Sequence, residues 1–122
     1  MWKNEPCKTV LITGASSDIY ICIASSGLGE HFARLSARAG ANVIIAARRF
    51  AKLQELAAEL KAIPGVEAHQ RFYPVVMDVT DVESIRTAFA KAEAEMGPAN
   101  VIVNNSGIAN PKFAVQMEVE DW

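Results

Sequence analysis

The chain has 122 residues, of which 51% are hydrophobic, so it can bury a core but is long enough for one domain at most. Its formal net charge of −2 gives no electrostatic reason to expect nucleic acid or an acidic membrane surface as a partner. The N-terminus has no signal-like apolar run, and no stretch approaches the length that spans a bilayer. With only Cys7 and Cys22, expected to be reduced thiols, the sequence predicts a cytoplasmic protein without a metal site.

Four short runs rich in Val and Ile predict β-strands. They are Thr9–Thr13, Asn42–Ala46, Phe72–Met77 and Asn100–Val103. Their apolar content is nearly continuous rather than alternating, as expected of strands that are covered on both faces. The sequence therefore predicts a parallel sheet.

Three amphipathic runs of helical length separate these strands. The first two are Gly27–Ala39, which ends at a glycine suited to a left-handed cap, and Arg49–Ala62. The third opens with Thr80–Glu83, a T-x-x-E capping box, and closes at Gly97–Pro98. The alternation predicts an α/β fold, a partial Rossmann (doubly wound) fold of about four parallel strands in the order 3-2-1-4 with three main helices.

The turn after the first predicted strand carries a glycine pattern typical of a phosphate site. Thr13-Gly14-Ala15-Ser16-Ser17 follows the strand directly, and Gly27-Leu28-Gly29 opens the next helix. A tight turn needs a residue without Cβ, and backbone N–H groups must come within hydrogen-bond distance of a pyrophosphate. The following helix then points its positive end at that anion. The pattern predicts a nucleotide phosphate loop.

Each later strand also ends in a distinctive motif, at the edge where such sheets bind ligands. These motifs are Ala47-Arg48-Arg49, Asp78-Val79 and Asn104-Asn105-Ser106-Gly107. Together with the glycine loop they resemble the short-chain dehydrogenase/reductase family, over essentially the whole chain except the N-terminal lead and one insertion. The resemblance implies an oxidoreductase that transfers hydride between NADP(H) and a carbonyl or hydroxyl substrate, with residues 1–122 forming a single incomplete dinucleotide-binding domain.

The resemblance also implies a role for individual residues in holding a nicotinamide dinucleotide. The pyrophosphate loop would consist of Gly14, Ser16, Gly27, Leu28 and Gly29. Asp78 would contact the adenine, with Val79 contributing its backbone. Asn104 and Gly107, in the NNSG turn, would stabilise the sheet and border the adenine ribose.

The end of the second strand bears on the choice between NADP and NAD. Relatives that prefer NAD usually place Asp or Glu there, to accept hydrogen bonds from the 2′-hydroxyl. Here Ala46-Ala47 is followed by Arg48 and Arg49, whose guanidinium groups suit a 2′-phosphate. The alternative is a solvated pair of arginines at a helix start. The sequence favours NADP over NAD.

The catalytic residues of the family have no counterpart in this chain. The family uses a Ser and a Tyr-x-x-x-Lys pair in its second half to move the proton and hold the nicotinamide ribose. Tyr20 and Tyr73 are followed four residues later by Ala24 and Met77. We therefore name no catalytic residue and expect a truncated chain that is inactive alone, with a small-molecule substrate only in a full-length form. The alternatives are a non-catalytic nucleotide-binding module and a non-functional truncated product.

Residues 18–26 interrupt the glycine loop. The family pattern would read TGASSGLG, whereas nine residues separate Ser17 from Gly27 here. Ala15-Ser16-Ser17 recurs as Ala24-Ser25-Ser26, which indicates a tandem duplication or an artefact of splicing or gene prediction. The insertion is expected to lower the affinity for the cofactor.

The fourth predicted strand is expected to promote association of the chain. In the whole fold of the family it is an inner strand, so in this chain Val101–Val103 would be an unpaired apolar edge. We expect low solubility or self-association through it.

Overall fold

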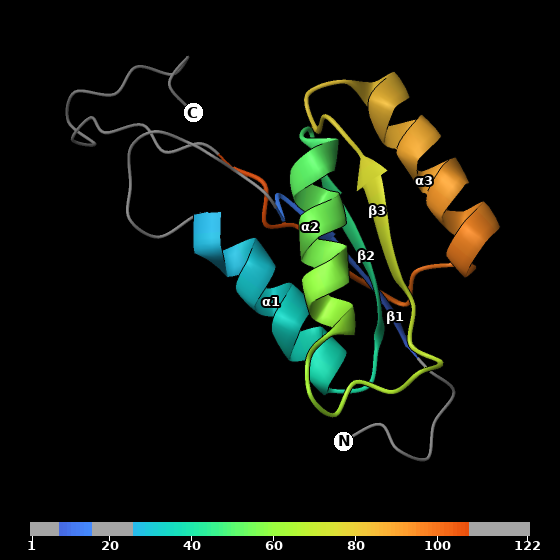
Figure 1. Cartoon of the computed structure of the whole chain (residues 1–122). Helices are drawn as coiled ribbons and strands as arrows, with labels where there is room; N and C mark the ends of the chain where they lie inside the picture. Colours follow the sequence, from blue (N-terminus) through green and yellow to red (C-terminus); the bar gives the residue numbers. More distant parts are fainter. Residues whose placement is uncertain (1–7, 16–25, 108–122) are drawn as a thin grey trace.

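The computed structural model describes residues 8–15 and 26–107 (Figure 1). Strands and helices alternate along these residues: β1 (Thr9–Thr13), α1 (Ser26–Arg38), β2 (Asn42–Ala47), α2 (Phe50–Lys61), β3 (Phe72–Val76), α3 (Val82–Met96) and β4 (Val101–Val103). The strands are all parallel and lie in the order β3-β2-β1-β4. The predicted partial Rossmann fold is therefore confirmed.

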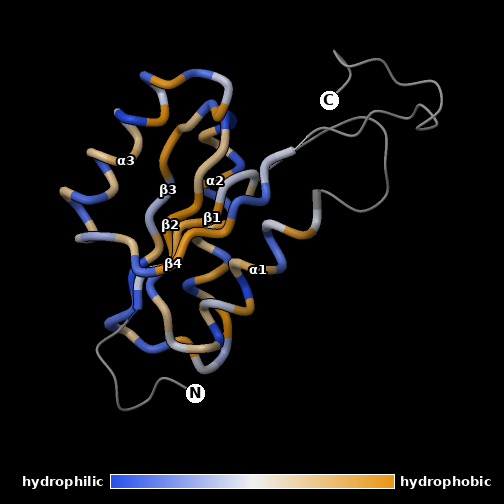
Figure 2. Tube along the Cα trace, turned by 180° about the vertical axis from the view of Figure 1, so that it is seen from behind, coloured by the Kyte–Doolittle hydropathy of each residue, from blue (hydrophilic) through white to orange (hydrophobic). Residues whose placement is uncertain are grey.

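Successive residues of the central strands point to opposite faces of the sheet. Val10 and Ile12 of β1 belong to an apolar cluster with α1 and α2. Leu11, between them, belongs to a second cluster that includes Ala88 and Ala92 of α3. In Figure 1, α1 and α2 accordingly lie on one face and α3 on the other, and Figure 2 shows the strands as the hydrophobic centre. The two covered faces explain why the strands are apolar without alternation.

The end of α1 agrees with the sequence. Gly40 has φ 92°, and its N–H donates to Ala37 O over 3.1 Å. The N–H of Ala41 donates to Ser36 O over 3.0 Å. These two bonds form a Schellman motif, which requires a left-handed residue where Gly40 stands. The predicted glycine cap is confirmed.

The start of α3 differs from the predicted capping box. The helix begins at Val82, and the Asp81 carboxylate caps it by accepting the N–H of Glu83 over 3.0 Å. The hydroxyl of Thr80 instead donates to Asp78 Oδ1 over 2.7 Å. The prediction of Thr80 as the cap is wrong because Asp81 lies one residue nearer and its charge suits the positive end of the helix.

The described sheet has two dissimilar ends. At one end β4 pairs with β1, and Val101 and Ile102 are 41% and 50% exposed. The apolar edge that the sequence predicts is therefore present on the described part of the sheet. Nowhere in residues 8–15 and 26–107 is a helix long and apolar enough to cross a membrane.

Candidate functional site

The turn after β1 requires a glycine at position 14. Gly14 has φ +69°, a conformation that L side chains rarely adopt. A Cβ on Gly14 would also lie 3.0 Å from the backbone N and Cα of Ser106. The turn after β1 and the turn after β4 are thus in close contact, which leaves no room for a side chain between them.

Gly29 and Gly27, in the first turn of α1, have opposite surroundings. A Cβ on Gly29 would lie 2.6 Å from Gly14 O and 2.7 Å from Asn105 Nδ2. A Cβ on Gly27 would meet no atom of the described residues within 4 Å. The three glycines therefore do three things: Gly14 makes the tight turn, Gly29 lets the helix approach it, and Gly27 leaves an open position.

The polar groups that join the β1 and β4 turns come from Thr13 and from the NNSG turn. The hydroxyl oxygen of Thr13 accepts the N–H groups of Asn105 and Ser106, each over 3.1 Å. Asn105 Nδ2 donates to Gly14 O over 3.3 Å. Asn104, expected to stabilise this region, is exposed. Because β4 lies beside β1, the predicted strand order could have indicated that the residues ending these two strands would meet.

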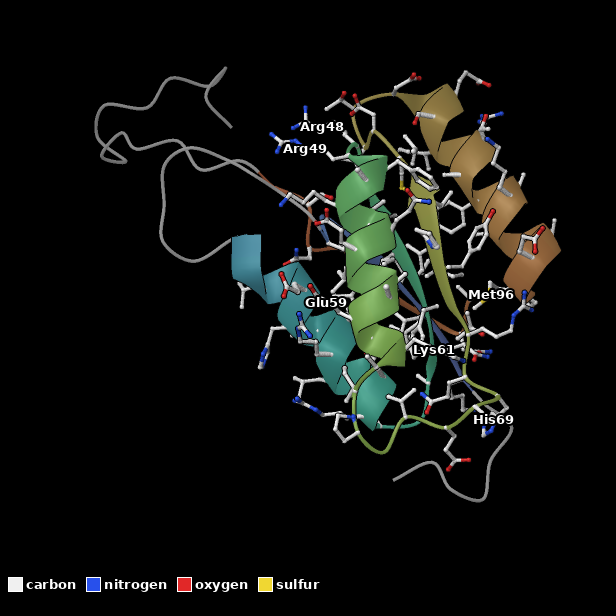
Figure 3. The ribbon with its side chains drawn as sticks, in the orientation of Figure 1. Arg48, Arg49, Glu59, Lys61, His69 and Met96 are labelled. Atoms are coloured by element: carbon white, nitrogen blue, oxygen red, sulfur yellow. The ribbon has the colours of Figure 1, made fainter. Side chains whose placement is uncertain are left out.

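The ends of β2 and β3 bring Arg48 and Asp78 to neighbouring positions. The N–H of Met77 donates to Ala47 O over 3.0 Å, so the next residue on each strand projects beyond the paired part of the sheet. Arg48 and Arg49 are exposed and lie at the end of the molecule opposite His69 (Figure 3). His69 is therefore remote from the motifs at the strand ends.

Asp78 is held in its ionised form. Its Oδ1 accepts both the N–H of Thr80, over 2.9 Å, and the Thr80 hydroxyl, over 2.7 Å. These two bonds, the hydroxyl first, lower the pKa of the Asp78 carboxyl below its ordinary value, and the positive charge of Arg48 lowers it further. The result is a fixed negative charge beside an exposed positive one.

Most of the predicted site residues thus lie at one edge of the sheet, on its strand ends or on the first turn of α1. They are Gly14, Gly27, Leu28, Gly29, Arg48, Arg49, Asp78, Val79, Asn104 and Gly107. Ser16 lies outside the described residues, as does the predicted insertion apart from Ser26, where α1 begins. The sequence missed Thr13, Asn105, Ser106 and Thr80. Across the described ranges, no group of three or more His, Cys, Asp or Glu could hold a metal ion.

A glycine turn, an open helix N-terminus and polar strand ends on a parallel sheet define the class of Rossmann-type dinucleotide-binding domains. Within that class, the short chain dehydrogenase family model matches residues 8–122. The chain belongs to that family.

Two curated relatives illustrate the similarity. The 3-oxoacyl-[acyl-carrier-protein] reductase FabG of Thermotoga maritima is 34% identical over 115 residues, which are 94% of this chain and 41% of the relative. The galactitol 2-dehydrogenase (L-tagatose-forming) of Cereibacter sphaeroides is 35% identical over 99 residues, 81% of this chain and 36% of that enzyme. The chain therefore spans about two fifths of the length of these relatives.

Solved structures agree with the sequence relatives. The L-sorbose reductase of Gluconobacter frateurii, complexed with NADPH and L-sorbose, superposes with a TM-score of 0.73 at 28% identity, covering 95% of this chain and 39% of the reductase. The alcohol dehydrogenase of Thermococcus sibiricus, complexed with 5-hydroxy-NADP, gives 0.74 at 28% identity, covering 95% of this chain and 44% of that enzyme.

Proposed function

We propose that this chain is the dinucleotide-binding part of a short-chain dehydrogenase/reductase and that it binds NADP(H) at the carboxyl edge of its sheet. The observation that carries the proposal is the contrast among the glycines. Gly14 and Gly29 are packed tightly, whereas a Cβ on Gly27 would meet no atom of the described residues within 4 Å. In a full-length protein the bound nucleotide would exchange hydride with a carbonyl or hydroxyl substrate. The Ser and the Tyr-x-x-x-Lys pair of the family, which have no counterpart in this chain, would have to be supplied by the rest of such a protein.

The first turn of α1 suits the pyrophosphate. A helix has no internal partners for its first N–H groups, and its N-terminus carries a partial positive charge. No acidic residue lies in the first turn of α1 to oppose an anion. With no Cβ at Gly27, a phosphate oxygen can approach the backbone of Gly27 and Leu28. Ser16 completes the phosphate loop in this proposal.

The ends of β3 and β4 suit the adenosine. The Asp78 carboxylate can accept a hydrogen bond from the adenine amino group, and the backbone of Val79 lies next to it in the chain. Val79 is also exposed, as an apolar surface that contacts a base must be. Asn104 and Gly107 would border the adenine ribose from the turn after β4.

The end of β2 favours NADP over NAD. Ala46 and Ala47 are buried and offer no carboxylate to a ribose 2′-hydroxyl. Arg48 and Arg49 follow immediately and are exposed at this edge, where a guanidinium can pair with a 2′-phosphate. Two structural neighbours were solved with NADPH or an NADP derivative, which supports the same preference.

Calorimetric titration of the chain with NADPH and NADH, comparing Gly27→Ala with Gly29→Ala, tests the proposal. The wild type should bind NADPH more tightly than NADH. Gly27→Ala should keep its thermal stability but lose about tenfold or more in NADPH affinity, since its methyl group occupies the open position. Gly29→Ala should lower stability by about 1–3 kcal/mol, because its Cβ overlaps backbone atoms.

Unchanged NADPH affinity in Gly27→Ala would contradict the proposed pyrophosphate site, and equal affinity for NADPH and NADH would contradict the preference for NADP.

The same titration tests the predicted effect of the insertion at 18–26. Its expected effect, a lower affinity than in a chain lacking these residues, stays a prediction, although the close approach of Gly29 to Gly14 exists in its presence.

A further inference from the structure

Thr80 has a hydroxyl that the helix does not use. The capping of α3 belongs to Asp81, and the Thr80 side chain turns back towards the end of β3. Its hydroxyl and its own N–H donate to the same atom, Asp78 Oδ1, over 2.7 and 2.9 Å. One carboxylate oxygen of Asp78 therefore receives two donors from a single residue.

The rest of Asp78 is anchored as well. Its N–H donates to the hydroxyl oxygen of Ser84 over 2.9 Å, and its carbonyl oxygen accepts the N–H of Asp81 over 3.1 Å. The backbone of Asp78 is thus joined to α3, and its carboxylate is joined through Oδ1 to Thr80. Among the described residues, no hydrogen bond to Oδ2 competes with an incoming ligand.

We propose that Thr80 is a positioning residue, which orients the Asp78 carboxylate so that Oδ2 reads the exocyclic amino group of the adenine. The inference rests on the proposed function. An ionised carboxylate is only an acceptor, so it attracts an amino group and repels a keto oxygen at the same place. Thr80 thereby sets the selectivity for the base, while contacting the nucleotide only through Asp78.

The charge at the site fits this role. A protonated Asp78 would carry its own donor and would no longer distinguish an amino group from a keto oxygen. The Thr80 hydroxyl is the largest influence that lowers the pKa of Asp78 below its ordinary value, and Arg48 at the end of β2 acts in the same direction. The nearby carboxylate of Asp81 is directed to the α3 N-terminus, where it accepts the N–H of Glu83.

A purely structural role for Thr80, as a turn residue between β3 and α3, predicts a different outcome. Such a turn needs the backbone N–H of Thr80, which a substitution retains. Thr80→Val keeps the shape and the N–H but removes the hydroxyl, and Thr80→Ser retains the hydroxyl. Thr87→Val, at an exposed position within α3, is the matched control for the same chemical change.

The experiment has two readouts on the full chain. Carboxyl ¹³C NMR titration should show the pKa of Asp78 rising towards its ordinary value in Thr80→Val, but not in Thr80→Ser or Thr87→Val. Calorimetry should compare NADPH with its reduced hypoxanthine analogue, in which a keto oxygen replaces the amino group. Thr80→Val should lose about three- to tenfold of the wild-type preference for NADPH, which corresponds to one hydrogen bond.

Each outcome bears on the inference. A raised pKa with a reduced preference for adenine, both restored by Thr80→Ser, supports it. An unchanged preference in Thr80→Val, while the wild type binds NADPH, overturns the inference and leaves the proposed function intact. An unchanged pKa in Thr80→Val also overturns it. A wild type that binds neither nucleotide contradicts the proposed function and the inference together.

Discussion

The two ends of the described sheet are built differently. β3 is covered by α2 on one face and α3 on the other, and it contains Pro74. The N–H of Met77 points to β2, so by alternation the position of Pro74 faces the outer edge, where proline removes a donor. β4 pairs with β1 on one side and consists of Val101, Ile102 and Val103, so this strand contains neither a charged residue nor a proline. Val101 and Ile102 are exposed.

This difference predicts that the β3 end of the sheet resists further pairing better than the β4 end. Natural edge strands are protected by proline, by charge or by a helix over the edge, and β3 has the proline. On the other side, a hollow of about 200 Å³ lies between α3 and β4, lined partly by Phe89, Ala99 and Ile102. Among the described residues, the outer edge of β3 therefore carries a protective proline, whereas the exposed residues of β4 are apolar.

The largest expected difference between the two sides is in stability. Leu53 of α2 is fully buried in the cluster with β1 and β2, so Leu53→Ala should lower the free energy of unfolding by about 2–5 kcal/mol. Ile102→Ala on β4 should lower it by about 1 kcal/mol or less, because Ile102 is half exposed. Urea unfolding measures both. Equal losses would show that β4 is as well packed as the α2 side.

A second difference should appear in self-association. Ile102→Lys places a charge on the open edge and should reduce concentration-dependent association in sedimentation velocity. Val76→Lys is the matched control, since Val76 on β3 is 49% exposed against 50% for Ile102, and it should leave association unchanged. Equal effects of the two lysines, or a wild type that sediments as a monodisperse monomer, would contradict association through β4.

The smallest expected effect concerns the ion pair between α1 and α2, the two helices on one face. Arg34 of α1 pairs with Glu59 of α2 and, over 2.6 Å, with Glu30; both carboxylates raise the Arg34 pKa. Glu59→Gln should cost about 0.2–1 kcal/mol at low salt and less at high salt, because the pair is largely exposed. Glu55→Gln, which removes a 4.0 Å pair within α2, should cost less. An equal loss in the free energy of unfolding in both variants would show that the ion pair between α1 and α2 adds no stability beyond that of a pair within one helix.

The sequence predicted the four strands to within one residue of their observed ends, and it predicted the strand order. This was possible because strands that are buried on both faces must be apolar throughout, and glycines such as Gly40 mark helix ends by their backbone conformation. The glycine motif was also readable, because the absence of a Cβ is a property of the residue itself.

The hydrogen bonds that shape the site were harder to predict. Thr13 and Asn105 are far apart in sequence and meet only because β4 lies beside β1. Thr80 and Asp81 are both acceptable caps; in the structure the Asp81 carboxylate accepts the N–H of Glu83, while the Thr80 hydroxyl donates to Asp78. Gln70 is almost completely buried, and its amide donates to Ala37 O and Ala41 O, which satisfies its polar group there. No local sequence pattern indicates these long-range bonds.

The sequence by itself therefore determined the class of fold and the positions of the glycine turns, since these follow from hydrophobic periodicity and from residues without a side chain. The motifs at the strand ends indicated the family by resemblance. Tertiary structure alone decided which glycines are closely packed against other segments, and that the Thr80 hydroxyl donates to Asp78. Those outcomes depend on distances of about 3 Å between segments that the sheet brings together, and a hydrogen bond or an overlap is decided at that scale.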